Sequence, residues 1–312
     1  MNVPGGFLHG IAAAGTEFPA SEFAVERHAL RAPFEGMFVW DIRCKVGESP
    51  VWDAQTQCLL WIDVRGQALL RLDPVSRRAR RWDLPDVVGA VGLLDPYTAL
   101  LALRRQLGVL DLRAGTLGLL PEVTQEPEFN RLNEGKFSPS GAWFVFGSMD
   151  DRPGDKQATG NLYRADRSGQ VTPLHAGLTI ANGIAWSLDG RRIYFSDSYA
   201  GRVFQAAWDE RTGTLSGATL FVQSDNVAGR PDGALVGADG AYLSAGVSAA
   251  CLNKFDPSGR LLRKVALPLQ APTMPCLGGR DMTQLFVTSL VRPGTDPGEY
   301  DGCLLEMAID VD

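Results

Sequence analysis

The sequence predicts an all-β protein, a six-bladed β-propeller with four antiparallel strands in each blade. Short runs of apolar and β-branched residues alternate with polar residues along nearly the whole chain, as in half-buried strands. Similar units recur about every 41 to 50 residues, the spacing expected of propeller blades. The 312 residues include 35 glycines and 19 prolines, which imply many turns rather than many helices.

The first 36 residues differ from this pattern. They show no strand alternation, so residues 1–36 are expected to be a disordered leader, or an extension foreign to the native chain, that can be removed without loss. The apolar stretch 7–15 follows no basic residue and is interrupted by His9, which does not fit a secretory signal peptide. We therefore expect the propeller to span residues 37–312.

A strand precedes the first unit and has an expected partner at the other end of the chain. Phe38, Trp40 and Ile42 alternate with polar or smaller residues, and the sixth unit ends at Asp312 before its fourth strand. We expect residues 38–44 to pair beside residues 303–308. An N-terminal strand would then complete the last blade and close the ring.

Each of the six units has the same order: a strand, a tight turn, a second strand, a loop, a third strand and a second turn. Aspartate, proline and glycine in the turns supply the backbone dihedrals that hairpins need. The first turns lie at 53–56, 95–97, 138–141, 188–190, 238–240 and 278–281, and the second turns at 73–76, 111–115, 166–169, 209–213 and 256–259. A parallel α/β fold is the alternative, but no apolar helical period is long enough for crossover helices.

Composition limits the partners. The net charge of −6 provides no basic face for a nucleic acid, and no apolar run approaches the roughly 20 residues of a membrane helix. Five cysteines without CxxC spacing indicate free thiols in a reducing compartment, and hence a cytoplasmic protein. No obligate protein partner is expected.

A polar side chain precedes the first turn by about five residues in four of the units. These residues are Glu48, Asn133, Asn182 and Asp232. If the units are equivalent blades, their first strands are innermost and the four side chains converge at one mouth of the central channel. Four oxygen donors suit a hard divalent ion such as Ca²⁺, Mg²⁺ or Mn²⁺, whereas any one of them alone could simply cap its own turn.

Other site chemistries are not expected. The chain has only three histidines, His9, His28 and His175, which argues against a Ser-His-Asp triad or a histidine-rich zinc site. No glycine-rich loop leads into a helix, so a nucleotide cofactor has no cradle. Asp63 and Asp197 end second strands near the same mouth, where bonding to loop N–H groups is the expected role.

Four segments resemble the signature of the SMP-30/gluconolactonase/LRE family: 47–52, 130–136, 180–183 and 231–233. The resemblance covers roughly residues 40 to 307, in order and at family spacing. It implies a six-bladed propeller with a divalent metal in its central channel that hydrolyses lactones of aldonic acids. By position, it implies that Glu48, Asn182 and Asp232 are the metal ligands. Arg131, Asn133 and Asp151 would contact the substrate.

The expected activity is therefore that of a lactonase, which hydrolyses a sugar lactone to the aldonic acid. A divalent ion, expected to be Ca²⁺ with Mg²⁺, Mn²⁺, Zn²⁺ or Fe²⁺ as alternatives, would polarise the carbonyl and activate water, with Asp232 as base. A phosphotriesterase-like hydrolase on the same metal site and a noncatalytic calcium-binding propeller remain alternatives. Arg131 and Asn133 favour a polar, hydroxylated substrate. Residues 242–250 depart from the family pattern, which leaves open which sugar lactone fits.

Overall fold

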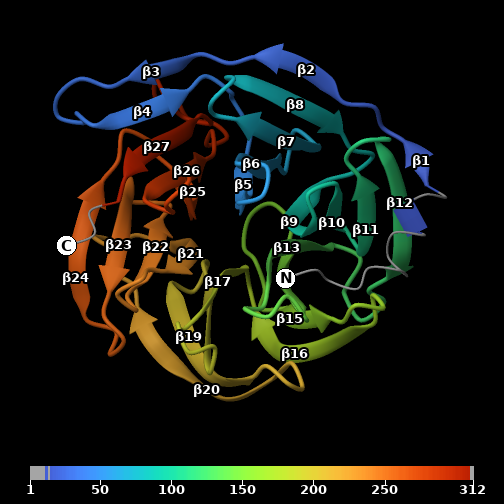
Figure 1. The fold of residues 1–312 in the computed structure, drawn as a ribbon. Coiled ribbons are helices and arrows are strands. Elements are labelled where there is room, and N and C mark those ends of the chain that lie inside the picture. The colour runs from blue at the N-terminus through green and yellow to red at the C-terminus, as the bar shows by residue number, and fades with distance from the viewer. Residues whose placement is uncertain (1–10, 13–14, 310–312) are drawn as a thin grey trace.

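The computed structural model describes residues 11–12 and 15–309 and confirms the predicted fold. Six antiparallel sheets surround a central axis, as Figure 1 shows. The first strand of each blade lies nearest the axis, and the later strands follow outward.

The blades follow one another along the chain. Blade 1 contains β5 (Gly47–Asp53), β6 (Cys58–Asp63), β7 (Ala68–Asp73) and β8 (Arg78–Asp83); blade 2 contains β9 (Val88–Asp95), β10 (Thr98–Leu103), β11 (Gln106–Asp111) and β12 (Thr116–Glu122). Blade 3 contains β13 (Asn130–Phe137), β14 (Phe144–Asp150), β15 (Gly160–Ala165) and β16 (Val171–Leu178); blade 4 contains β17 (Ala181–Trp186), β18 (Arg192–Asp197), β19 (Arg202–Asp209) and β20 (Thr214–Gln223). Blade 5 contains β21 (Pro231–Val236), β22 (Tyr242–Gly246), β23 (Cys251–Phe255) and β24 (Leu261–Ala266); blade 6 contains β25 (Pro272–Gly278), β26 (Gln284–Ser289), β27 (Leu304–Ala308) and β4 (Met37–Trp40).

The ring closes as the sequence predicted. Strand β4 pairs antiparallel with β27, with Trp40 opposite Leu304 and Val39 opposite Leu305. The N-terminal strand thus supplies the fourth strand of blade 6. Closing the ring in this way leaves no blade incomplete.

Residues before Met37 add strands that the sequence analysis did not expect. Strand β1 (Thr16–Glu17) pairs with β12, β2 (Ser21–Ala24) with β8, and β3 (Arg27–Ala29) with β4. They run along the outer edges of blades 2, 1 and 6, so we call residues 16–29 the strap (Figure 1).

The expectation of a disordered leader is therefore wrong for the strap. Its strands are too short to show alternation, but the outer edges of three blades offer them unpaired backbone groups. Val25 is buried, and Phe18 and Phe23 pack on the cores beside it. His9 lies outside the described residues.

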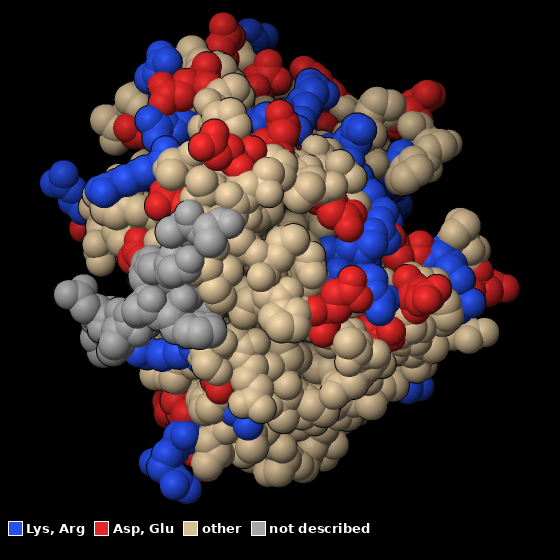
Figure 2. Space-filling model, turned by 90° about the vertical axis from the view of Figure 1, so that its right-hand side faces the viewer, with Lys and Arg blue, Asp and Glu red and all other residues tan. Residues whose placement is uncertain are grey.

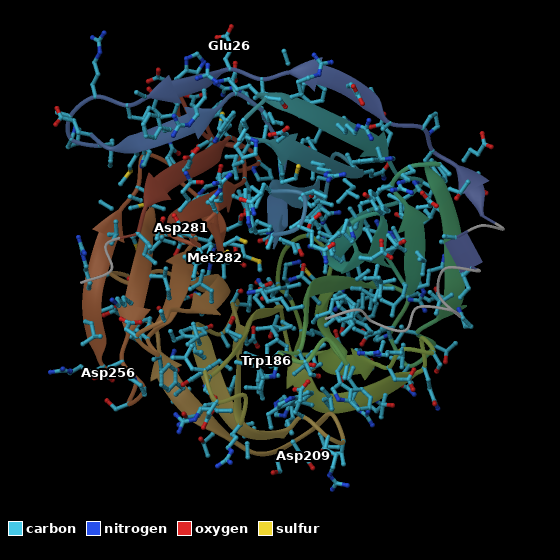
Figure 3. All side chains as sticks on the ribbon, viewed as in Figure 1. Glu26, Trp186, Asp209, Asp256, Asp281 and Met282 are labelled. Atoms are coloured by element: carbon cyan, nitrogen blue, oxygen red, sulfur yellow. The ribbon has the colours of Figure 1, made fainter. Side chains whose placement is uncertain are left out.

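The hydrophobic core is divided among the spaces between neighbouring blades. Each of six clusters joins residues from two adjacent sheets. Trp40, Trp61 and Trp82 are fully buried in the clusters on either side of blade 1. Figure 3 shows side chains filling these spaces, whereas the turn residues Asp209 and Asp256 lie at the periphery. Packing both faces of each sheet holds the innermost strands in fixed positions around the axis.

Two further sequence expectations can be compared with the structure. The five cysteines are all free thiols, as predicted. Within the described residues, no helix has the length and apolar character needed to cross a membrane. On the face shown in Figure 2, basic and acidic side chains are interleaved.

Candidate functional site

The four predicted polar residues lie on innermost strands of four blades. Glu48 is on β5, Asn133 on β13, Asn182 on β17 and Asp232 on β21. All four are buried, with exposed fractions of 9%, 8%, 4% and 7%.

A break in strand register occurs at each of these positions. The pairing shifts between Glu48 and Val51, between Leu132 and Gly135, between Asn182 and Ala185, and between Pro231 and Ala234. A β-bulge bends its strand and re-aims a side chain. The repeated bulge therefore gives four blades the same means of turning a polar group inward.

The bulge of blade 4 explains the glycine that follows Asn182. Gly183 has φ of +65°, and a Cβ there would lie 2.5 Å from the Tyr242 hydroxyl. That hydroxyl donates a hydrogen bond of 2.9 Å to the Gly183 carbonyl. Glycine is therefore required both by the backbone conformation and by the close approach of blade 5.

Hydrogen bonds connect three of the four residues in one chain. Asn133 Nδ2 donates to Asn182 Oδ1 at 2.8 Å and to the Ala181 carbonyl at 2.9 Å. Asn182 Nδ2 in turn donates to Asp232 Oδ1 and, at 2.8 Å, to Ser198 Oγ. The predicted convergence of blades 3, 4 and 5 is thus present in the structure.

Glu48 joins this group from blade 1 through electrostatics. Burial raises the pKa of Glu48, and the neighbouring charges of Asp232 and Glu134 raise it further. Burial also raises the pKa of Asp232 to about 8, with the charge of Glu134 adding to the effect. No arginine or lysine of the described residues forms a salt bridge with either carboxylate.

Two buried carboxylates that repel one another favour a bound cation. The side chains of Glu48, Asn182 and Asp232 carry carboxylate and amide oxygens, the donors that hard divalent ions prefer, and in this structure Asn182 turns its Nδ2 toward Asp232. Within the described part of the chain, no cluster of three or more His, Cys, Asp or Glu side chains is suited to a metal ion. Of the three candidate ligands, only Glu48 and Asp232 belong to those residue types. The residues therefore fit a divalent ion.

Glu134 is a site residue that the sequence analysis missed. Its carboxylate is buried and accepts hydrogen bonds of 2.7 Å from the backbone N–H groups of Gly183 and Ile184. It therefore fastens the bulge that carries Asn182 to the strand that carries Asn133. The sequence signal was available, because Glu134 lies inside the 130–136 segment, directly after Asn133.

The predicted substrate-contacting residues extend the row of hydrogen bonds that runs from Asn133 to Asp232. Arg131 Nη1 donates to Asn133 Oδ1 at 2.7 Å, and Arg131 Nε donates to Asp151 Oδ1 at 3.1 Å. Two more arginines, Arg65 and Arg104, also contact Asp151. Neither arginine lies in one of the four segments that resemble the family signature.

Asp63 and Asp197 have the expected role. Asp63 accepts hydrogen bonds of 3.0 Å from the N–H groups of Lys45 and Val46. Asp197 accepts from the N–H of Thr179 at 2.8 Å. Both carboxylates stabilise the loops that lead into innermost strands.

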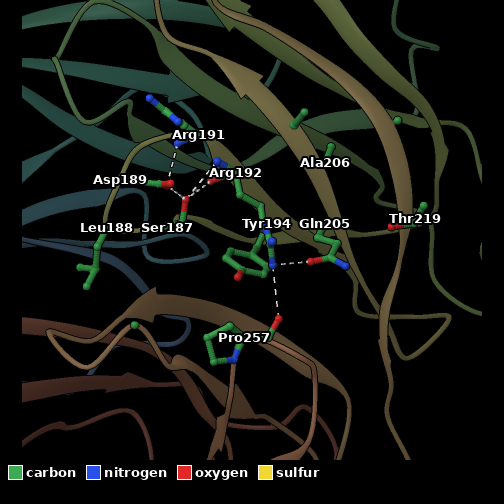
Figure 4. Close-up of a pocket in the computed structure, with 13 residues that line it drawn as sticks. Ser187, Leu188, Asp189, Arg191, Arg192, Tyr194, Gln205, Ala206, Thr219 and Pro257 are labelled. Atoms are coloured by element: carbon green, nitrogen blue, oxygen red, sulfur yellow. Dashed lines mark hydrogen bonds between the residues drawn. The ribbon is translucent and has the colours of Figure 1, made fainter.

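A groove between blades 4 and 5 lies apart from these residues. Figure 4 shows its lining, which includes Ser187, Tyr194 and Pro257 and none of the predicted site residues. Arg192 Nη1 crosses it, donating to Gln205 Oε1 at 2.9 Å and to the Pro257 carbonyl at 3.3 Å. Because its guanidinium bridges two blades, we interpret this groove as an inter-blade contact.

Comparison with known proteins gives concordant matches. A family model described as SMP-30/gluconolactonase/LRE-like region matches residues 46–291. Regucalcin of Xenopus laevis is 30% identical over 249 residues, covering 78% of this chain and 83% of that protein. The pentonolactonase XacC of Haloferax volcanii is 32% identical over 264 residues, covering 85% of this chain and 86% of that protein.

A solved structure gives the same result in three dimensions. The crystal structure of a calcium-binding protein, regucalcin, from Agrobacterium tumefaciens strain C58 has a TM-score of 0.80 at 28% identity. The match covers 86% of this chain and 91% of that one. The family model spans all six predicted site residues, from Glu48 to Asp232, and most of the propeller. The chain belongs to the SMP-30/gluconolactonase/LRE-like family.

Proposed function

We propose that this protein is a lactonase that hydrolyses a sugar lactone to its aldonic acid. One observation carries the proposal: the hydrogen-bonded chain from Arg131 through Asn133 and Asn182 to Asp232, with the Glu48 carboxylate beside it. The name of the Haloferax relative, a pentonolactonase, supports a sugar lactone as substrate. A buried row of amide, guanidinium and carboxylate groups suits a substrate that has several hydroxyl groups.

In this proposal, Glu48, Asn182 and Asp232 hold one divalent ion, with Ca²⁺ the first choice. The calcium-binding description of the Agrobacterium structure supports that choice. When bound, such an ion polarises a carbonyl oxygen and makes a water molecule more acidic.

The protein's own groups then have separate roles. Asp232 accepts the proton of the attacking water at a carboxylate oxygen and returns it to the ring oxygen as the ring C–O bond of the lactone breaks. Asn133 and Arg131 donate hydrogen bonds to the substrate oxygens, including the one that gains charge as the tetrahedral centre forms. Asp151 fixes the direction of the Arg131 guanidinium by accepting from its Nε at 3.1 Å. Glu134 positions Asn182 through the bulge.

A pH-stat assay tests the proposal. The protein is assayed on a panel of aldonolactones and one phosphotriester, with and without a chelator. We expect acid release from at least one lactone and loss of this activity on chelation. Phosphotriester turnover without lactone turnover would instead indicate a phosphotriesterase-like hydrolase. Metal binding without any turnover would indicate a noncatalytic calcium-binding propeller.

A further inference from the structure

Three arginines surround one carboxylate at the end of the propeller where the innermost strands begin. Asp151 Oδ1 accepts from Arg131 Nε at 3.1 Å and from Arg65 Nη2, and Asp151 Oδ2 accepts from Arg65 Nη1 at 3.2 Å and from Arg104 Nη1 at 3.4 Å. We call Arg65, Arg104 and Arg131 the arginine rim.

The rim is assembled from three blades at the end where the substrate site lies. Arg65 is in the turn after β6, Arg104 is in the turn after β10, and Arg131 is on β13. Asp151 directly follows β14. Second strands end at the same mouth at which the innermost strands begin, so the rim and the candidate metal ligands share one face. Arg131 connects them directly through Asn133.

Positive charge exceeds negative charge here. Asp86 accepts from Arg104 Nε at 3.2 Å and is the second carboxylate of the rim. Lys156 adds a further cation, since its Nζ donates to the carbonyls of Asp150 and Arg152 at 2.8 and 2.7 Å. The side chains of Asp150 and Arg152 form an ion pair at 2.7 Å, so their charges cancel. Arg65, Arg104, Arg131 and Lys156 together carry two more charges than Asp86 and Asp151 balance, in a chain whose net charge is −6, and the buried Glu48 carboxylate also acts on Arg131.

A clamp for Asp151 alone does not need this arrangement. One guanidinium can satisfy both oxygens of a carboxylate in bidentate fashion, and Arg65 already contacts both. Adding Arg104 and Arg131 places three positive charges around one carboxylate. A further bound anion would reduce the repulsion among these charges. The Arg65 and Arg104 side chains are 42% and 35% exposed, so a ligand can reach them, whereas that of Arg131 is 8% exposed.

We propose that Arg65 and Arg104 form an anion-binding subsite, and that the substrate is a sugar lactone with a second, negatively charged group remote from its ring carbonyl. The group is a carboxylate, sulfonate or phosphate, the oxyanions that guanidinium groups bind in bidentate geometry. Excess positive charge at the mouth also attracts such a substrate during diffusion. This inference rests on the proposed lactonase function and names its substrate class.

The test compares matched lactones on the full chain supplied with Ca²⁺. kcat/KM is measured for glucono-1,5-lactone, for its 6-phosphate and for glucarolactone, which carries a carboxylate. The variants are Arg65→Gln, Arg104→Gln and their combination. Arg211→Gln is the control, because it removes one positive charge from a turn at the opposite end of the blades, where the side chain is 86% exposed. Titration calorimetry with 6-phosphogluconate and with gluconate measures binding independently of turnover.

We expect at least one anionic lactone to be preferred over the neutral one by about tenfold or more, the size expected for a charge-assisted contact. The double variant should remove this preference, with neutral-lactone turnover within about threefold of the parent and Arg211→Gln unchanged. The phosphate and carboxylate substrates distinguish which oxyanion the subsite takes. Raising the salt concentration should weaken the preference.

Other outcomes overturn one claim or both. No preference in the parent, or an equal fall for neutral and anionic lactones in the variants, would show that the rim only holds Asp151 in place. If no lactone is hydrolysed but 6-phosphogluconate binds more tightly than gluconate, and the double variant loses this selectivity, the subsite stands and the lactonase proposal fails. Absence of both turnover and selective binding overturns both.

Discussion

Removing Arg27 should destabilise the protein by loosening the closure of its ring. Arg27 lies on β3 of the strap, and its Nε and Nη2 atoms each donate to the Glu306 carboxylate at 2.9 Å. Trp40 Nε1 donates to the same carboxylate at 2.8 Å. One buried acid therefore joins β3, β4 and β27, the three strands at which the ends of the chain meet.

The expected cost follows from the burial of the two partners. Breaking a buried ion pair by deleting one partner costs about 3–5 kcal/mol. The Arg27 side chain is 24% exposed and that of Glu306 is 6% exposed, so water can partly solvate the remaining carboxylate. Arg27→Ala also loses the stacking of its guanidinium 3.4 Å from the centre of the Phe38 ring. We therefore expect a loss of about 2–4 kcal/mol, or roughly 3–6 °C in melting temperature for a chain of 312 residues.

The assay is thermal and urea denaturation followed by circular dichroism. The matched control is Arg78→Ala, which breaks an ion pair between β8 and Glu22 of the strap whose side chains are 58% and 44% exposed. An exposed pair contributes at most about 1 kcal/mol, so this variant should melt within about 1.5 °C of the parent. Equal melting temperatures for Arg27→Ala and Arg78→Ala would refute the argument that the buried pair secures the closure.

Three further predictions concern the strap and the site. A chain starting at Met37 should melt at a lower temperature, because Phe23 and Val25 no longer pack in the core. Its turnover per folded molecule should stay within about threefold of the parent at 25 °C. An unchanged melting temperature would show that the strap contributes nothing to stability. Asp232→Asn should lower kcat by about 10² to 10⁴-fold while still binding metal, whereas Asn182→Asp should mainly change metal affinity. Near-parental turnover by Asp232→Asn at saturating metal would mean that Asp232 is a ligand and not the base. EDTA should abolish turnover and lower the melting temperature, and more than one hard divalent ion should restore both. Full activity after removal of the metal would contradict the metal-centred proposal.

The sequence could predict the propeller and the placement of four polar residues on its innermost strands because both follow from repetition. Turn residues recur at fixed offsets, and each unit begins its first strand at the same mouth, so a polar residue in the same phase of several units reaches the same place. Glu48, Asn133, Asn182 and Asp232 could be found in this way, whereas the choice of ligands among them rests on the family resemblance. The closing strand could be found because the last unit lacks one.

Glu134 illustrates what repetition cannot reveal. In a regular strand, adjacent side chains point to opposite faces, so Asn133 and Glu134 would not serve the same site. The register shift between Leu132 and Gly135 alters this alternation and lets Glu134 reach the backbone of Gly183 and Ile184. A bulge depends on pairing with the neighbouring strand, which a single strand's pattern does not record.

The strap illustrates a second limit. Its strands contain two to four residues and bury few side chains of their own, so they have no period for a sequence pattern to show. They are ordered by the edges of blades that are folded from residues further along the chain.

The arginine rim could not be predicted either, because it depends on contacts between blades that no single strand's pattern records. Arg65 and Arg104 occupy turns of different blades, and only the radial arrangement brings them to one carboxylate on a third blade. In a propeller, the innermost strands bring carboxylates to the axis, and the turns after the second strands bring arginines around them. A divalent cation would neutralise the first group and an anionic substrate the second. The same blade geometry that concentrates negative charge at the proposed metal ligands thus leaves an excess of positive charge at the rim, where we propose that the far end of the substrate lies.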